Sequence, residues 1–146
     1  MNQAFILATK ALAHNDVPIG AVIVKDGKII ARGENRVQEL KNPTLHAEIV
    51  AINKACKKLH SKFLDGCDLY VTLEPCSMCA TAISFARIKN IYFAARDIKG
   101  GGILHNAKVY DNDKHLWKPN VYEMPEYAGK SADVLKTFFA QLRNKN

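Results

Sequence analysis

Two short motifs, one with a histidine and one with two cysteines, constrain most strongly how this chain can fold. The first is His46-Ala47-Glu48 and the second is Pro75-Cys76-Ser77-Met78-Cys79. Residues three apart are neighbours on a helix, so both cysteine sulfurs can reach one ion. Imidazole and thiolate are ligands that zinc prefers in proteins. A fold that uses these ligands together must bring two segments that are far apart in the chain to a common point.

The ligand set favours a catalytic zinc site over a structural one. His46, Cys76 and Cys79 supply three ligands, which leaves the fourth tetrahedral position open. A structural site needs a fourth protein ligand, and no other histidine lies in a comparable motif; the others are His14, His60, His105 and His115. Taken alone, Cys-x-x-Cys is also typical of redox-active pairs and of half a zinc knuckle. The two motifs together indicate the metal centre.

Glu48 is the candidate proton carrier of this site. Two thiolates and a neutral imidazole cancel the charge of Zn²⁺. The ion therefore acidifies its bound water less than a zinc ion held by three histidines would, and a nearby base helps. Positions i and i+2 do not share a helix face. The carboxylate of Glu48 is therefore expected beside the metal, where it can pass protons from water to a substrate.

The hydrophobic pattern predicts alternating helices and strands in a single domain over residues 1–146. Helices are expected over residues 2–14, after Thr44 as N-cap, after Pro75, and after Ser131 as N-cap. Strands are expected over residues 19–24, 28–34, 68–73, 90–95 and 121–124, with Asp26-Gly27 as a hairpin turn. Residues 35–45 are expected to form a loop, and residues 96–110 to be irregular. This order predicts a three-layer α/β/α fold with a central mixed five-stranded sheet.

Composition narrows the class of protein. No apolar run reaches the ~18 residues that span a bilayer, and no signal peptide is recognisable at the N-terminus, so we expect a cytoplasmic protein with no membrane partner. The net charge of +7 favours a polyanionic partner. Cys56 and Cys67, which have no metal-ligand spacing, are expected to be small buried residues.

The chain resembles the cytidine-deaminase-like superfamily, and within it the bacterial tRNA-specific adenosine deaminases. The resemblance covers nearly the whole chain. The zinc motifs are specific for the superfamily, whereas three further segments point to the tRNA branch: Val17-Pro18-Ile19-Gly20, Glu34-Asn35-Arg36 and Ala95-Arg96-Asp97.

This resemblance implies hydrolysis of the wobble adenosine in a tRNA anticodon loop to inosine, with release of ammonia, by a homodimer that holds one zinc ion per chain. His46, Cys76 and Cys79 would bind zinc, and Glu48 would be the proton shuttle. The resemblance also implies that Asn35 hydrogen-bonds the flipped base and that Asp97 contacts the sugar-phosphate of the loop.

Two other functions remain open from the sequence. A free-base or nucleoside deaminase acting on guanine or cytosine uses the same zinc ligands, although it gains little from a basic surface. A non-catalytic, zinc-stabilised RNA-binding subunit is the second, although such a subunit usually loses the carboxylate that Glu48 supplies. Asn42 and Leu45 depart from the family pattern, and the alignment is weakest over residues 100–119. The lysines there and nearby are equally compatible with phosphate contacts and with a solvated face: Lys99, Lys108, Lys114 and Lys118.

Overall fold

A mixed five-stranded sheet organises the chain, as the sequence predicts. The computed structural model describes residues 1–146. Its strands are β1 (Gly20–Lys25), β2 (Lys28–Glu34), β3 (Asp68–Leu73), β4 (Asn90–Ala95) and β5 (Asn120–Glu123). They lie in the order β2-β1-β3-β4-β5. β1 is antiparallel to both of its neighbours, whereas β3, β4 and β5 are parallel to one another.

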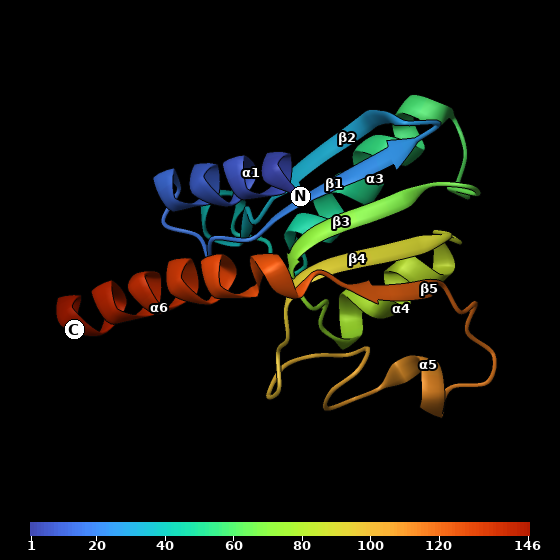
Figure 1. Cartoon of the computed structure of the whole chain (residues 1–146). Helices are drawn as coiled ribbons and strands as arrows, with labels where there is room; N and C mark the ends of the chain where they lie inside the picture. Colours follow the sequence, from blue (N-terminus) through green and yellow to red (C-terminus); the bar gives the residue numbers. More distant parts are fainter.

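Helices cover both faces of this sheet and make the three layers (Figure 1). On one face lie α1 (Asn2–Ala13) and α6 (Ala128–Lys145), and on the other lie α3 (Ala47–Leu59) and α4 (Ser77–Phe85). The C-terminal part of α6 projects beyond the body of the protein. None of the helices combines the length and the apolar composition needed to span a lipid bilayer.

The core lies between the sheet and the α3/α4 layer. Strand residues alternate between faces, and the side chains of Leu69 and Val71 from β3 and of Ile91 and Phe93 from β4 are fully buried in this layer. They pack in one hydrophobic cluster with Ala51, Ile83 and other small and branched residues of the helices. The cluster fixes both helices against the same face of the sheet.

The β1–β2 hairpin turns where the sequence predicts it. Asp26 and Gly27 both have positive φ angles, of 50° and 77°. This is the backbone that a two-residue hairpin turn needs, and Asp-Gly adopts it readily. The turn pairs Lys25 with Lys28, and a shift of register between Ile23 and Val24 then brings Gly20 opposite Glu34 at the far end of the hairpin.

Two predicted helix caps were wrong. The helix α3 begins after His46, not after Thr44, whose hydroxyl donates instead to the Asn42 side chain at 2.8 Å. Ser131 lies inside α6, where its hydroxyl donates to the backbone oxygen of Thr72. Both hydroxyl groups therefore have partners other than a helix start.

Three short helices lie between the main elements. The predicted loop at 35–45 contains α2 (Val37–Leu40), and α5 (Val109–Asn112) lies at the end of the segment predicted to be irregular. A 3₁₀ turn, η1 (Pro125–Tyr127), leads from β5 into α6. The hydroxyl of Tyr110 in α5 donates to the backbone oxygen of Ala80 at 2.7 Å, which ties this short helix to α4.

Candidate active site

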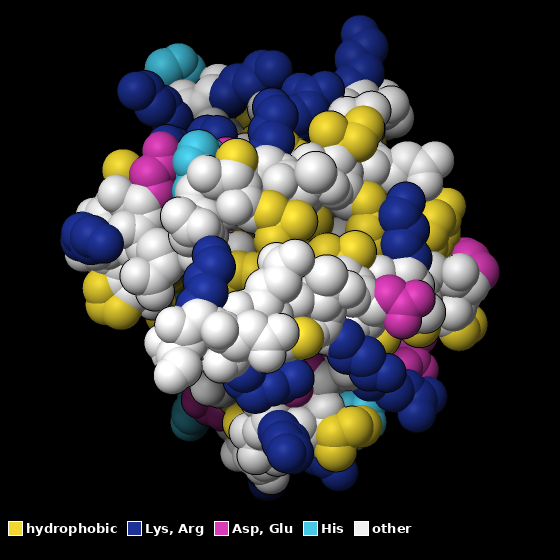
Figure 2. All heavy atoms as spheres, turned by 90° about the vertical axis from the view of Figure 1, so that its left-hand side faces the viewer, with side chains coloured by type: hydrophobic (Ala, Val, Ile, Leu, Met, Phe, Trp, Pro, Cys, Tyr) yellow, Lys and Arg dark blue, Asp and Glu magenta, His cyan; other side chains and the backbone are white.

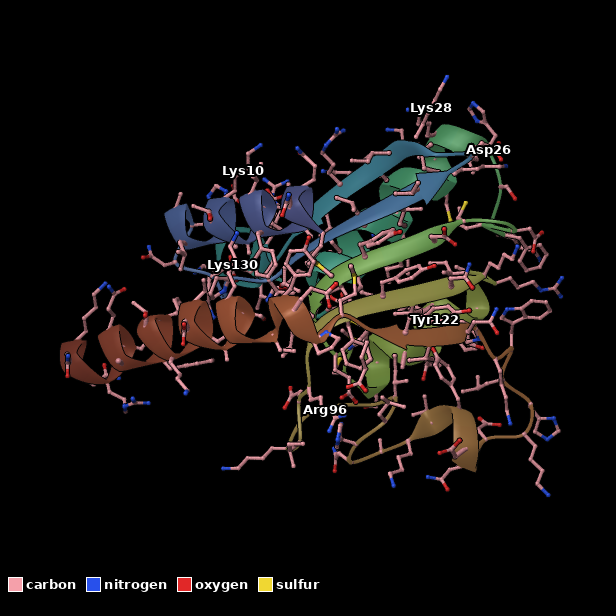
Figure 3. The ribbon with its side chains drawn as sticks, viewed as in Figure 1. Lys10, Asp26, Lys28, Arg96, Tyr122 and Lys130 are labelled. Carbon is pink, nitrogen blue, oxygen red and sulfur yellow. The ribbon has the colours of Figure 1, made fainter.

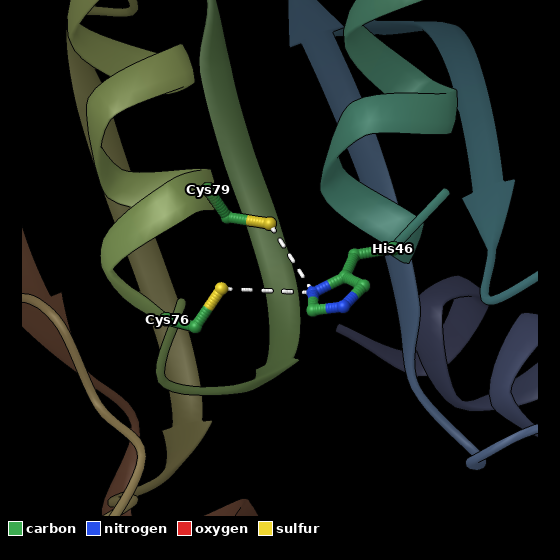
Figure 4. A group of neighbouring side chains, drawn as sticks. All are labelled: His46, Cys76 and Cys79. Carbon is green, nitrogen blue, oxygen red and sulfur yellow. Dashed lines mark hydrogen bonds between the residues drawn. The ribbon is translucent and has the colours of Figure 1, made fainter. Parts of the chain in front are cut away.

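The fold brings the two sequence motifs together at the starts of α3 and α4 (Figure 4). His46 is the N-cap residue of α3, and Cys76 is the N-cap residue of α4. Nδ1 of His46 lies 3.6 Å from the Sγ atom of Cys76 and 3.6 Å from that of Cys79. All three ligand atoms lie within 4.8 Å of one another.

This spacing suits a tetrahedral zinc ion. With Zn–S bonds of about 2.3 Å and Zn–N bonds of about 2.0 Å, tetrahedral geometry separates the nitrogen and sulfur ligands by about 3.5 Å, close to the distances in the protein. The group contains no fourth His, Cys, Asp or Glu. Three protein ligands of these types are the donor set of a catalytic zinc site.

The two thiols of this group have opposite pKa shifts. Hydrogen bonds from the Cys79 thiol and from His46 lower the pKa of Cys76 to about 4. The hydrogen bond to Cys76 and burial both raise the pKa of Cys79. The pair thus holds one thiolate and one thiol that face a common point. A divalent cation at that point favours the thiolate form of both.

Glu48 lies in the first turn of α3, and its side chain is buried. Its Oε1 atom has no hydrogen-bond partner in the protein, which is uncommon for a buried polar group. Burial raises the pKa of Glu48 to about 7. A carboxyl group that titrates near neutral pH can both accept and donate a proton under ordinary conditions.

The site includes a cavity of about 480 Å³. Its floor contains His46, Glu48 and Cys76, and its walls come from the ends of β3 and β4 and from one side of α6. Figure 2 looks at the protein from the side on which these strand ends lie. On that face Lys and Arg side chains outnumber Asp and Glu side chains and surround a central group of hydrophobic ones.

Asn35 lines this cavity and also caps α3. Its side-chain oxygen accepts the backbone N–H of Ala47 at 2.7 Å, and the residue is only 4% exposed. The capping contact was not foreseen from the sequence, because it joins positions that are not in a local capping motif. With its oxygen occupied, Asn35 has its Nδ2 amide group left to face a ligand.

Asp97 lines the cavity as well, at the start of the loop that follows β4. Its Oδ1 atom accepts the backbone N–H of Gly100 at 2.9 Å. The neighbouring Arg96 also lines the cavity, and its guanidinium is paired with the Glu123 carboxylate. Asp97 is thus both a turn residue and part of the cavity wall.

The sequence did not reveal the contribution of α6 to the cavity. Leu135, Lys136 and Phe139 line it from this helix. The apolar stripe of α6 was recognisable, but the surface against which it packs depends on tertiary contacts. Asn42 and Leu45, which depart from the family pattern, do not line the cavity. The same holds for the four lysines noted above, Lys99, Lys108, Lys114 and Lys118, which are all exposed.

Comparison with known proteins assigns the class. The family model for MafB19-like deaminases matches residues 1–143. The tRNA-specific adenosine deaminase of Agrobacterium fabrum is 46% identical over 98% of this chain and 93% of its own length. That of Aquifex aeolicus is 44% identical over 94% of this chain and 89% of its own.

Solved structures indicate the same class of protein as the sequence relatives do. A structure from a study of A-to-I editing by tRNA:A34 deaminases at the wobble position has a TM-score of 0.89 and 46% identity, over 92% of this chain and 97% of that chain. Guanine deaminase from Bacillus subtilis is 42% identical but has a TM-score of 0.64, over 77% of this chain and 66% of that chain. The fold and the ligand group are those of a deaminase with the cytidine-deaminase-like fold. The chain belongs to the family of tRNA-specific adenosine deaminases, which confirms the resemblance seen in the sequence.

The capping role of Asn35 can be tested by stability. Asn35→Ala removes the buried acceptor of the Ala47 N–H, and we expect it to lower the free energy of unfolding by about 1–3 kcal/mol. Asn35→Asp keeps an acceptor at the start of a helix, so we expect a smaller loss. Urea unfolding of both variants in the same buffer measures the difference. Equal stability of Asn35→Ala and wild type would contradict the capping role.

Proposed function

We propose that this protein hydrolyses the wobble adenosine of a tRNA anticodon loop to inosine and ammonia. The observation that carries the proposal is the combination, in one cavity, of three convergent soft ligands with a buried carboxyl oxygen that has no protein partner. The names of the relatives supply the substrate. The free-base alternative is less well supported, because the guanine deaminase structure of Bacillus subtilis has a TM-score of 0.64, against 0.89 for the structure from the tRNA:A34 deaminase study.

His46, Cys76 and Cys79 would hold the metal ion. Their donor types and their spacing fit zinc, as described above. When bound, zinc supplies Lewis-acid activation of a water molecule. The lowered pKa of Cys76 keeps one ligand in its thiolate form before any ion binds.

Glu48 would move the protons of the reaction. Its unpaired oxygen can accept a proton from the attacking water and give it to a ring nitrogen of adenine, while a C–O bond forms at the amino-bearing carbon. Glu48 then delivers the second proton of the water to the departing amine as the C–N bond breaks, so ammonia leaves and inosine remains. A pKa of about 7 suits a group that must do both.

Asn35 and Asp97 would bind the substrate. The free Nδ2 group of Asn35 can donate to an acceptor on the extruded base. Asp97, at the rim, is suited to accept a hydrogen bond from a ribose hydroxyl. These two roles belong to the nucleotide that reacts.

The rim of the cavity suits an anionic polymer. Arg96 is paired with Glu123, whereas Lys136 is exposed and has no salt bridge. With a net charge of +7, this favours RNA over a neutral free base. Because the proposed substrate is tRNA, we also propose that the protein acts in the cytoplasm.

We further propose a homodimer that uses the exposed side of α4. Phe85 is 68% exposed, and it forms an apolar groove with Ala82, one helical turn before it, and Met78, two turns before it. Exposed apolar surface of this kind marks interaction sites. Because α4 also carries Cys79, a second copy seated there would lie behind the metal ligands and leave the cavity open.

The Glu48 role is tested by Glu48→Gln. We expect unmodified tRNA incubated with the wild type to yield inosine only at the first anticodon position. In the variant, turnover should fall by a factor of about 10²–10⁴, because proton transfer is lost while the shape is kept. Zinc content and tRNA binding should stay unchanged, and Glu126→Gln, an exposed control, should be fully active. Full turnover by Glu48→Gln would remove this residue from the mechanism, and deamination of free guanine with none of tRNA would reverse the substrate assignment.

A contact between Lys136 and a phosphate of the RNA can be tested by the salt dependence of tRNA binding. We expect tRNA affinity, measured in the Glu48→Gln background, to fall steeply with ionic strength. Lys136→Ala should reduce the slope of log K against log salt by about 0.7, because one single-strand phosphate contact is lost. Lys130→Ala is the matched control, because Lys130 lies on the same helix (Figure 3), but its ammonium group lies over the Phe5 ring, at 4.5 Å from the centroid. An identical slope for wild type and Lys136→Ala would contradict the contact.

The dimer is tested by Phe85→Glu. A charge on this surface should separate the copies, so we expect the variant to sediment as a 16.2 kDa monomer where the wild type sediments as a dimer. Ile6→Glu changes another exposed apolar residue, on α1, and should leave the dimer intact. Analytical ultracentrifugation measures both. A monomeric wild type, or a dimeric Phe85→Glu, would contradict the interface.

A further inference from the structure

Glu74 is a buried carboxylate beside the metal ligands with no part in the chemistry described above. It lies between the end of β3 and Pro75, and its side chain is fully buried. Its Oε2 atom accepts the backbone N–H groups of Ile103, Leu104 and His105, at 3.3, 3.0 and 3.1 Å. Its Oε1 atom lies 3.3 Å from the backbone nitrogen of Asp97 and 2.7 Å from Nδ1 of His105.

These contacts satisfy the carboxylate completely. Burial alone raises the pKa of Glu74, but the hydrogen bonds from His105 and from the backbone amides outweigh it and hold the pKa below the usual value. A buried carboxylate without such donors would be strongly disfavoured. All of the donors come from one segment, residues 97–105, so the ion organises that segment.

The same segment also touches the start of α4. A Cβ atom added to Gly101 would lie 2.3 Å from Oε2 of Glu74, and one added to Gly102 would lie 2.5 Å from the backbone nitrogen of Ser77. The N–H of Gly102 donates to the backbone oxygen of Pro75 at 2.8 Å. The backbone of the segment thus lies directly on the Glu74 carboxylate and on the turn that presents Cys76.

This segment carries one wall of the cavity. Asp97 is its first residue, and Arg96 precedes it; both line the cavity. In Figure 3, Arg96 lies at the beginning of the long loop that leaves β4. Movement of the segment would therefore move this wall relative to the metal ligands, while His46, Cys76 and Cys79 would keep their own supports on α3 and α4.

We propose that Glu74 and His105 form a positioning pair that fixes the segment of residues 97–105 against the start of α4 and thereby sets the affinity for the RNA substrate. The inference rests on the proposed function. Neither residue is a catalytic residue, because the carboxylate is fully occupied by the loop, and His105 gives its Nδ1 atom to the carboxylate and does not line the cavity. The pair acts through Asp97 and Arg96.

His105 gives the sharpest test, because it is partly exposed and its replacement leaves Glu74 with its backbone donors. His105→Ala removes the side-chain donor, and His105→Gln restores an N–H donor. We expect KM for an anticodon stem-loop to rise by about tenfold in His105→Ala, with kcat and zinc content close to wild type, and to be largely recovered in His105→Gln. Glu74→Gln, which turns an amide N–H₂ toward N–H donors, should raise KM further. Asp113→Asn, a change in the same region at an exposed residue, should have no effect.

Hydrogen exchange separates this inference from the proposed function, because it needs no substrate. The amides of Ile103 and Leu104 should exchange faster in His105→Ala than in wild type and Asp113→Asn. Unchanged exchange and unchanged KM in His105→Ala would overturn the pair, and so would a fall in kcat or loss of zinc at constant KM. If the wild type does not deaminate tRNA, the proposed function and the role in affinity fail together, and the exchange rates alone decide whether the pair holds the loop.

Discussion

The site depends on two helices that begin at the same edge of the sheet. Because β1 is antiparallel to both β2 and β3, those two strands run in the same direction and end at one edge. Neighbouring strands are about 4.8 Å apart, so β2 and β3 end about 10 Å from each other. This matches the 8–10 Å between packed helices. The long helices that come after them, α3 (beyond the short α2) and α4, start side by side on one face, and their N-cap residues meet (Figure 4).

The same arrangement favours the chemistry of the ligands. A helix start carries partial positive charge, which stabilises a thiolate near the first turn. Cys76 occupies that position on α4, and Cys79 follows three residues later on the same face. Two cysteines and a histidine at these two helix starts therefore converge on one point.

Much of this arrangement could be predicted from the sequence, because its signals are periodic or local. Each of the five strands contains β-branched or aromatic residues, which favour strands, and the hairpin follows from Asp26-Gly27. The helix caps at Thr44 and Ser131 could not be predicted correctly. A hydroxyl that suits a cap also suits any nearby acceptor. Thr44 donates to Asn42, two residues before it, and Ser131 donates to the backbone of Thr72, which is distant in sequence.

The candidate site, too, could be predicted from the sequence only in part. Its ligands and Glu48 are recognisable because spacing along the chain fixes their relation to a helix start. The wall from α6 and the capping oxygen of Asn35 are not, because they join segments with no fixed relation in sequence. Glu74 stands next to the cysteine motif, yet its partner His105 lies in the segment where the alignment is weakest. Only the folded backbone brings the two together.

Two buried carboxylates, Glu48 and Glu74, line the same cavity and differ in their hydrogen bonding. Glu48 and Glu74 are exposed by only 4% and 2%, yet their pKa values move in opposite directions. Glu74 is surrounded by donors and stays ionised. Glu48 has an oxygen without a partner, and its pKa rises to about 7. Burial is thus common to both, and the supply of hydrogen-bond donors decides which carboxylate holds the structure and which is free to exchange protons.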